Sequence, residues 1–168
     1  MITGETDERL AQAMVDLIAR LFAREVSVRD GTVVSPLTPE MIGVVCAHVN
    51  QVSAVRERLP LAYAGILVET ANRFQGLERT ITLVQHPLSG RADADTFHLD
   101  RGRLCVSLSR HRVCCFIFAR AGIEELLRRS VPSGDRILGV PADPEFEGRL
   151  AHLSILRALR TQGRIVPM

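Results

Sequence analysis

The sequence predicts an α/β fold in a single domain, built on a mostly parallel sheet with helices on both faces. Four short apolar runs, rich in β-branched residues, have the composition of strands buried on both faces. Segments of helical character separate these runs, and no internal repeat or low-complexity tract interrupts the alternation. A length of 168 residues suits one domain over residues 1–168. The predicted strands are MIGVVCA at 41–47, GILVE at 65–69, TITLVQ at 80–85 and VCCFIFA at 113–119.

The helices are predicted from apolar spacing, capping residues and the placement of charge. The first is expected to end near Arg24, because apolar residues recur at helical spacing after a cap that is either Thr6 or Asp7. The last is expected to begin with Asp143 as its cap and to end at Gly163. Shorter helices are predicted at 51–59 and 101–110, a loop or helical turn at 70–78, and a helix at 123–129 within a C-terminal helical extension of about 121–168.

All 21 positively charged residues are arginine, and the chain contains no lysine. A phosphate-binding loop of the form G-x-x-x-x-G-K-[ST] needs a lysine, so the chain has no such loop. The formal net charge is only +2, so any contact with nucleic acid has to come from locally placed arginines. One tyrosine, six phenylalanines and no tryptophan argue against a base-stacking platform.

The four cysteines lack zinc-ligand spacing, and three of them lie in apolar runs, where cysteine behaves as a small hydrophobic residue. The N-terminal MITGETDER is acidic where a signal peptide is basic, and the longest apolar run, at 113–119, is far shorter than a membrane span. These features predict a cytoplasmic chain with no membrane partner.

Polar residues are concentrated in ETANRFQGLE at 69–78, directly after a predicted strand. Gly76 permits close approach of the backbone to an anion, Gln75 can donate or accept a hydrogen bond, and Glu78 can accept one from a sugar hydroxyl. The segment is therefore a candidate nucleotide contact. The alternative is a solvated turn, since turns are polar by default.

A second segment, DRGRLCVSLSRHR at 100–112, carries four arginines and no acidic residue after Asp100. A guanidinium can pair with two phosphate oxygens at once, and one that reaches a γ-phosphate stabilises the charge that develops during phosphoryl transfer. The alternative is a solvated helix face with ordinary ion pairs. The arginines are Arg101, Arg103, Arg110 and Arg112.

A third segment, CAHVNQ at 46–51, places His48, Asn50 and Gln51 just after a buried strand. His48 can contact phosphate or base, and the alternative is that His48 and Asn50 cap the following helix. Ligands of open parallel sheets bind beyond the carboxyl ends of the strands, so chemistry is expected at one edge, in the loops after residues 47, 69 and 85 and before 113. No metal site is predicted, because no ligand spacing relates the remaining histidines, His86, His98, His111 and His152.

Together and in this order, the three segments resemble motifs IV, V and VI of the second RecA-like domain of superfamily-one helicases, in the branch of the Upf, Dna and Sen-type enzymes. IGVVCAHVNQVSAVRERL is similar to motif IV, a strand followed by T-P-Y-x-x-Q. ETANRFQGLERTITLVQ is similar to motif V, T-x-x-x-x-Q-G-x-E before a strand, and RLCVSLSRHRVCCFIF to motif VI, R-L-N-V-A-x-[ST]-R-A-[RK] before another. The resemblance covers residues 41–120. It implies an AAA-type helicase C-terminal domain with a RecA-like fold, the P-loop NTPase fold without its own phosphate loop.

The resemblance also implies roles for single residues. Arg110 would be the arginine finger that reaches the γ-phosphate of ATP held on a partner domain, with Arg112 in support. Three residues would complete the nucleotide site, namely Gln75, Gly76 and Glu78. The residues that would contact single-stranded nucleic acid are Thr70, Asn72, Arg73, His48 and Gln51.

In helicases of this kind, ATP and Mg²⁺ are held mainly by a preceding N-terminal RecA-like domain, which carries the phosphate loop and its lysine. The resemblance therefore implies the C-terminal motor domain of an ATP-dependent DNA or RNA helicase or translocase, inactive by itself. Among the departures from the motifs, Cys46, Ala47 and His48 replace Thr-Pro-Tyr, Cys105 replaces an asparagine and His111 replaces an alanine. The alternative is a non-catalytic RecA-like module that binds nucleic acid or a protein partner.

Overall fold

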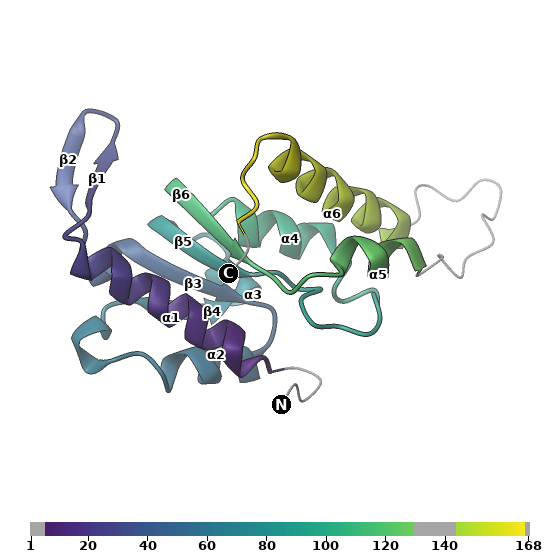
Figure 1. Cartoon of the computed structure of the whole chain (residues 1–168), viewed down its shortest axis with the longest axis horizontal. Coiled ribbons are helices and arrows are strands. Elements are labelled where there is room, and N and C mark those ends of the chain that lie inside the picture. Colours follow the sequence, from purple (N-terminus) through teal and green to yellow (C-terminus); the bar gives the residue numbers. More distant parts are fainter. Residues whose placement is uncertain (1–5, 130–143, 167–168) are drawn as a thin grey trace.

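The computed structural model describes residues 6–129 and 144–166 (Figure 1). At its centre lie four parallel strands in the order β4-β3-β5-β6. The α/β class and the parallel sheet predicted from the sequence are confirmed. The four strands are β3 (Ile42–Cys46), β4 (Leu67–Thr70), β5 (Arg79–Gln85) and β6 (His111–Phe118).

Helices cover both faces of this sheet, as predicted. They are α1 (Glu8–Ala23), α2 (Val49–Arg56), α3 (Ala71–Phe74) and α4 (Arg101–Leu108). α1 and α2 pack on one face, in a core that includes Val44 of β3. α3 and α4 pack on the other face, around Val45. Successive side chains of a strand point to opposite faces, so the fully buried β3 contributes to both cores.

The N-terminus of α1 is tied to the end of β6. Asp7 caps the helix, as predicted, by accepting a hydrogen bond from the backbone N of Leu10 at 3.0 Å. The same carboxylate accepts two hydrogen bonds from the guanidinium of Arg120, at 2.6 and 2.7 Å. The bonds from Arg120 hold the pKa of Asp7 below its ordinary value although burial opposes them. This contact fixes the position of α1 over the sheet.

A β-hairpin precedes the central sheet, although no strand is predicted for residues 25–36. Its strands are β1 (Ser27–Asp30) and β2 (Val33–Pro36), which pair antiparallel. Gly31 begins the two-residue turn with a φ of 61°, which favours glycine. An Asp-Gly pair between short valine-containing segments is a recognised hairpin signal. The hairpin reaches the sheet through Asp30, whose carboxylate lies 3.2 Å from Nε of Arg112.

The C-terminal helices are α5 (Ile123–Arg129) and α6 (Pro144–Thr161). Gly163 follows α6 with a φ of 63°, as expected for a residue that ends a helix. The predicted cap, Asp143, lies outside the described residues. α6 packs closely on the loop after β5, because a Cβ added to Gly148 would collide with the carbonyl oxygen of Leu99. This loop is therefore held between the sheet and α6.

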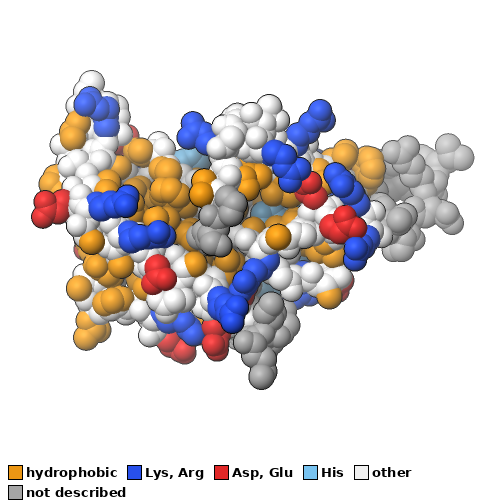
Figure 2. Space-filling model, in the orientation of Figure 1, with side chains coloured by type: hydrophobic (Ala, Val, Ile, Leu, Met, Phe, Trp, Pro, Cys, Tyr) orange, Lys and Arg blue, Asp and Glu red, His pale blue; other side chains and the backbone are white. Residues whose placement is uncertain are grey.

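Charged side chains of both signs are interspersed over the face shown in Figure 2, in keeping with a net charge of only +2. Contacts with a charged ligand therefore depend on particular arginines and not on a broad field. Among residues 6–129 and 144–166, no helix has the length and apolar character needed to cross a membrane.

Candidate functional site

The predicted site residues divide between two opposite edges of the parallel sheet. His48 and Thr70 lie at the carboxyl ends of β3 and β4, whereas Arg110 directly precedes β6. The expectation of a single edge is therefore wrong for the loop before residue 113. Because all four strands run in the same direction, the residues that precede one strand and those that follow its neighbour lie at opposite ends of the sheet.

At the carboxyl edge, the residues of the motif V segment lie beside β3. Thr70 is paired in register with Cys46, the last residue of β3. α3 begins directly after Thr70, and both Asn72 and Arg73 are exposed on it. The side chain of Arg73 is 75% exposed, and its guanidinium lies 3.8 Å from the carboxylate of Glu69. Such an exposed ion pair contributes little stability, so Arg73 can exchange this partner for a phosphate.

Gln51 is buried in the turn that begins α2 and is only 6% exposed. Its Oε1 accepts hydrogen bonds from the backbone N of Ala47 at 3.0 Å and of His48 at 3.1 Å. His48 is the N-cap of α2, which therefore begins and ends earlier than the predicted helix at 51–59. These bonds give the Gln51 oxygen a capping role, which the sequence reasoning did not predict. Contact of Gln51 with nucleic acid stays a prediction.

Replacing Gln51 by leucine is expected to lower the free energy of unfolding by about 1 to 2 kcal/mol, because two backbone N–H groups lose their acceptor. Gln51→Glu keeps an acceptor oxygen near the helix N-terminus, where negative charge is favourable, and is expected to lie within about 0.5 kcal/mol of the wild type. Urea unfolding followed by circular dichroism measures both variants. Equal losses in the two variants would contradict the capping role.

At the amino edge, a backbone hydrogen bond joins the motif V and motif VI segments. The backbone N of Arg79 donates to the carbonyl oxygen of Arg110 at 2.9 Å. Gln75, Gly76 and Glu78 are exposed in the turn that precedes β5, so this turn ends next to Arg110. Gly76 has a φ of 79°, and no atom lies within 4 Å of a Cβ built on it. The backbone of the turn is therefore open to a ligand.

The two arginines predicted to be catalytic have different surroundings. The guanidinium of Arg112 donates to Thr80 Oγ1 at 3.0 Å and forms the ion pair with Asp30. The guanidinium of Arg110 donates to the hydroxyl of its neighbour Ser109, at 2.7 and 3.2 Å. Within the described part of the chain, no carboxylate lies at ion-pair distance from Arg110. Of the two, Arg110 therefore carries the charge that remains available to an anion.

Four of the five histidines come together, although their spacing in the sequence indicates no shared site. His98 Nε2 lies 2.8 Å from His48 Nε2, and His98 Nδ1 lies 2.6 Å from Asp95 Oδ1. His152 Nε2 lies 3.1 Å from the carbonyl oxygen of His98, and His152 Nδ1 lies 3.3 Å from His86 Nε2. The histidines belong to separate segments, so no local sequence signal identifies this group.

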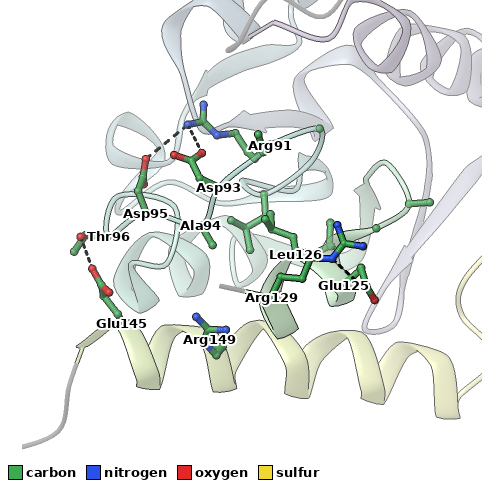
Figure 3. Close-up of a pocket in the computed structure, with 16 residues that line it drawn as sticks. Arg91, Asp93, Ala94, Asp95, Thr96, Glu125, Leu126, Arg129, Glu145 and Arg149 are labelled. Atoms are coloured by element: carbon green, nitrogen blue, oxygen red, sulfur yellow. Dashed lines mark hydrogen bonds and ion pairs between the residues drawn. The ribbon is translucent and has the colours of Figure 1, made fainter. Parts of the chain in front are cut away.

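A separate cavity of about 760 Å³ lies between the loop after β5 and the helices α5 and α6 (Figure 3). Dashed lines in Figure 3 join most of its polar side chains in pairs, whereas none of these lines reaches Arg149. The pairs are Arg91–Asp93 at 3.1 Å, Arg129–Glu125 at 3.0 Å and Thr96–Glu145 at 2.7 Å. None of the predicted site residues lines this cavity, although its loop follows the carboxyl end of β5.

An open parallel sheet with helices on both faces, and with candidate ligand contacts at its edges, has the architecture of a RecA-like α/β domain. A family model described as an AAA domain matches residues 6–122. The chain belongs to this family, AAA_12, the C-terminal RecA-like domain of superfamily-one helicases of the Upf and Sen type. No curated protein matches the chain.

Family membership also identifies the usual setting of this domain. Full proteins of the family use ATP and Mg²⁺, and the domain normally pairs with an N-terminal RecA-like domain. The match ends just before α5, so α5 and α6 lie beyond the region shared with the family.

Proposed function

We propose that this chain is the C-terminal motor domain of an ATP-dependent DNA or RNA helicase or translocase. It supplies the arginine finger and part of the surface that holds single-stranded nucleic acid. The surroundings of Arg110 carry the proposal, because no carboxylate among the described residues neutralises its guanidinium. A positive charge of this kind, presented by a partner domain, stabilises the transition state of phosphoryl transfer.

The amino edge fits one side of an ATP site. The open backbone at Gly76 allows an N–H group to approach a phosphate, and the exposed Glu78 can accept a hydrogen bond from a ribose hydroxyl. Gln75 lies beside them in the same turn. ATP supplies the phosphoryl group that is transferred to water, and Arg110 balances the charge that develops on it.

The remaining parts of the ATP site are assigned to the N-terminal partner domain. The chain has no lysine for a phosphate loop. In residues 6–129 and 144–166, no group of three or more His, Cys, Asp or Glu side chains could hold a metal ion. In helicases of this family the preceding domain would hold Mg²⁺, and this chain would complete the site when the cleft between the domains closes.

The carboxyl edge fits the backbone of single-stranded nucleic acid. Thr70 and Asn72 offer uncharged hydrogen-bonding groups, and Arg73 offers a guanidinium that is largely exposed. Few phosphates are neutralised by such a surface, so the affinity for nucleic acid should fall with salt at a shallow slope. Closing and reopening of the cleft at the opposite edge would move the strand along this surface.

ATP hydrolysis tests the proposal when it is measured on this chain alone and on the chain joined to the N-terminal domain of its helicase. We expect no hydrolysis above background from the chain alone, with or without single-stranded nucleic acid, because the chain has no lysine for a phosphate loop. We expect hydrolysis stimulated by nucleic acid from the joined protein. Hydrolysis by the purified chain alone would contradict the two-domain account.

A non-catalytic module is the second candidate, and the replaced Thr-Pro-Tyr of motif IV favours it. Cys46 stands there with a buried thiol, whose pKa burial raises to about 12, so it offers no reactive group. The Oε1 atom of Gln51 is bonded to the backbone. Under this alternative, the joined protein would bind nucleic acid and hydrolyse no ATP although both domains are folded.

A further inference from the structure

Three flat side chains form a stack at the carboxyl edge of the sheet. The ring of His48 lies nearly parallel to the ring of Phe97, with 5.0 Å between the ring centroids and 17° between the planes. Cζ of Arg103 lies 3.8 Å from the centroid of the same phenyl ring. Phe97 is 39% exposed, a large fraction for a phenylalanine. An exposed stack of this composition is unusual on a surface with so few aromatic residues.

We propose that the His48–Phe97–Arg103 stack is a base-stacking site for single-stranded nucleic acid. The proposal rests on the proposed function, because it places a nucleobase on the edge whose polar residues would hold the nucleic-acid backbone. Every base has a π-face, so stacking on flat side chains adds affinity without sequence preference. Phe97 lies outside the segment assigned to motif VI and adds a contact that the motifs do not include.

The stack lies beside the residues of the motif V segment. Nε of Arg103 donates to Oδ1 of Asn72 at 3.4 Å, so the guanidinium joins the stack to α3. His48 follows β3, and Phe97 lies in the loop after β5. β3 and β5 are neighbours in the sheet, and the chain adds β4 on one side of this pair and β6 on the other. The carboxyl ends of the strands at such a switch point form a crevice, and ligands of open α/β sheets bind there. A base in this crevice would reach the stack while its phosphate lies near Arg73.

A second layer of contacts fixes the orientation of the stack. Asp95 Oδ1 lies 2.6 Å from His98 Nδ1 and accepts a hydrogen bond from the backbone N of His98 at 3.0 Å. The side chain of His98 is only 3% exposed, and its Nε2 meets Nε2 of His48 at 2.8 Å. Asp95 and His98 are therefore positioning residues for the ring of His48. A preorganised stack costs less side-chain entropy when a base binds.

The test compares two labelled single strands of about ten nucleotides, a thymidine oligomer and an abasic oligomer with the same number of phosphates. Fluorescence anisotropy at low salt measures their affinity for the chain. Both strands offer the same backbone, so the ratio of their dissociation constants reports the contribution of the bases. We expect the wild type to bind the thymidine strand about fivefold or more tightly than the abasic strand.

Two variants with matched controls assign this ratio to the stack. Phe97→Leu is expected to bring the ratio of the two dissociation constants close to one. Phe146→Leu is the control, because Phe146 of α6 has a similar exposure of 37%, and it is expected to leave this ratio unchanged. Arg103→Lys keeps the charge and loses the planar group, so it should lower the ratio while preserving the salt dependence. Arg101→Lys, at an arginine of the same helix that is paired with Glu147, is the control.

The outcomes separate this proposal from the proposed function. Failure of both strands to bind at low salt would overturn the nucleic-acid surface and the stack together. Equal binding of both strands would leave the surface in place and overturn the stack alone. If Phe97→Leu and Arg103→Lys leave the ratio of the two dissociation constants unchanged, the stack alone is overturned. Circular dichroism confirms the fold of each variant, and Arg103→Lys decides the question where Phe97→Leu is not folded.

Discussion

Replacing Arg110 by alanine is expected to lower the turnover number for ATP hydrolysis about 10³-fold in the helicase that contains this domain. The affinity for ATP is expected to change little, because the triphosphate is held mainly by the N-terminal domain. An arginine finger acts on the charge that develops during transfer, and its loss therefore appears in turnover and not in binding. Steady-state hydrolysis and the binding of a labelled nucleotide measure the two quantities.

Arg112→Ala is the matched control. Its guanidinium is already bonded to Asp30 and Thr80, so we expect turnover to fall by less than about tenfold. Arg110→Lys keeps the charge without the planar fork and should restore only part of the lost turnover. Unchanged turnover in Arg110→Ala would remove the proposed role. Equal losses in the two alanine variants would show that Arg110 is not the single finger.

Between pH 7 and pH 5, the free energy of unfolding is expected to fall by about 4 kcal/mol, or about 2 kcal/mol for each of two buried histidines. Burial lowers the pKa of His86 to about 3 and that of His152 to about 4. In the unfolded chain both groups titrate near 6.5. The unfolded state therefore binds more protons than the folded state in this range. The stability that the two neutral histidines contribute is fully present above pH 6.5 and is lost as the pH falls.

The hydrogen bonds around these two histidines suit the neutral rings. The backbone N of Leu88 donates to His86 Nδ1 at 3.2 Å, so the proton of neutral His86 lies on Nε2. That proton points to His152 Nδ1, and His152 Nε2 then donates to the carbonyl oxygen of His98. Protonation of His152 would place its Nδ1–H against the Nε2–H of His86, and protonation of His86 would place its Nδ1–H against the backbone N–H of Leu88. The carboxyl groups with lowered pKa, which are Asp7, Glu40 and Asp95, lose their contribution only as the pH falls below about 4.5.

Urea unfolding at a series of pH values measures this loss. His152→Leu is expected to reduce the fall between pH 7 and pH 5 by about half, whatever its effect on stability at pH 7. His111 lies outside the group of four histidines, so His111→Gln should show the same fall in the free energy of unfolding between pH 7 and pH 5 as the wild type. NMR of the imidazole protons provides a direct check, since His86 and His152 should remain neutral at pH 5 in the folded chain. Protonation of either ring near pH 6.5 would contradict the prediction.

Most of the fold was predictable because local patterns and tertiary environment agree. The apolar IGVVC segment of β3 has no polar face, so it can only lie at the centre of a sheet covered on both sides. The hairpin of β1 and β2 was missed because its strands are short and mostly exposed, and they therefore lack the apolar alternation of a half-buried strand. The Asp30-Gly31 pair that leads into its turn was the available signal.

The candidate site was predictable only as a set of segments. The motif spacing identified the turn before β5 and the arginine before β6, which the structure places next to each other. The same spacing did not show that Arg112 is bonded to the hairpin or that the Gln51 oxygen caps α2. Side-chain partners of this kind depend on the position of other elements, which motif spacing does not describe.

By itself, the sequence determined the α/β class, the absence of a lysine for a phosphate loop, and the motif residues typical of the helicase family. The tertiary structure alone decided which of these residues lie at the same edge and what they contact. His48 meets His98 across 50 residues of chain, and His86 meets His152 across 66. No local pattern specifies such contacts, because they result from the way β3, β5 and α6 pack together. The physical reason is that helix and strand periodicity reports burial, whereas the identity of a partner depends on the whole fold.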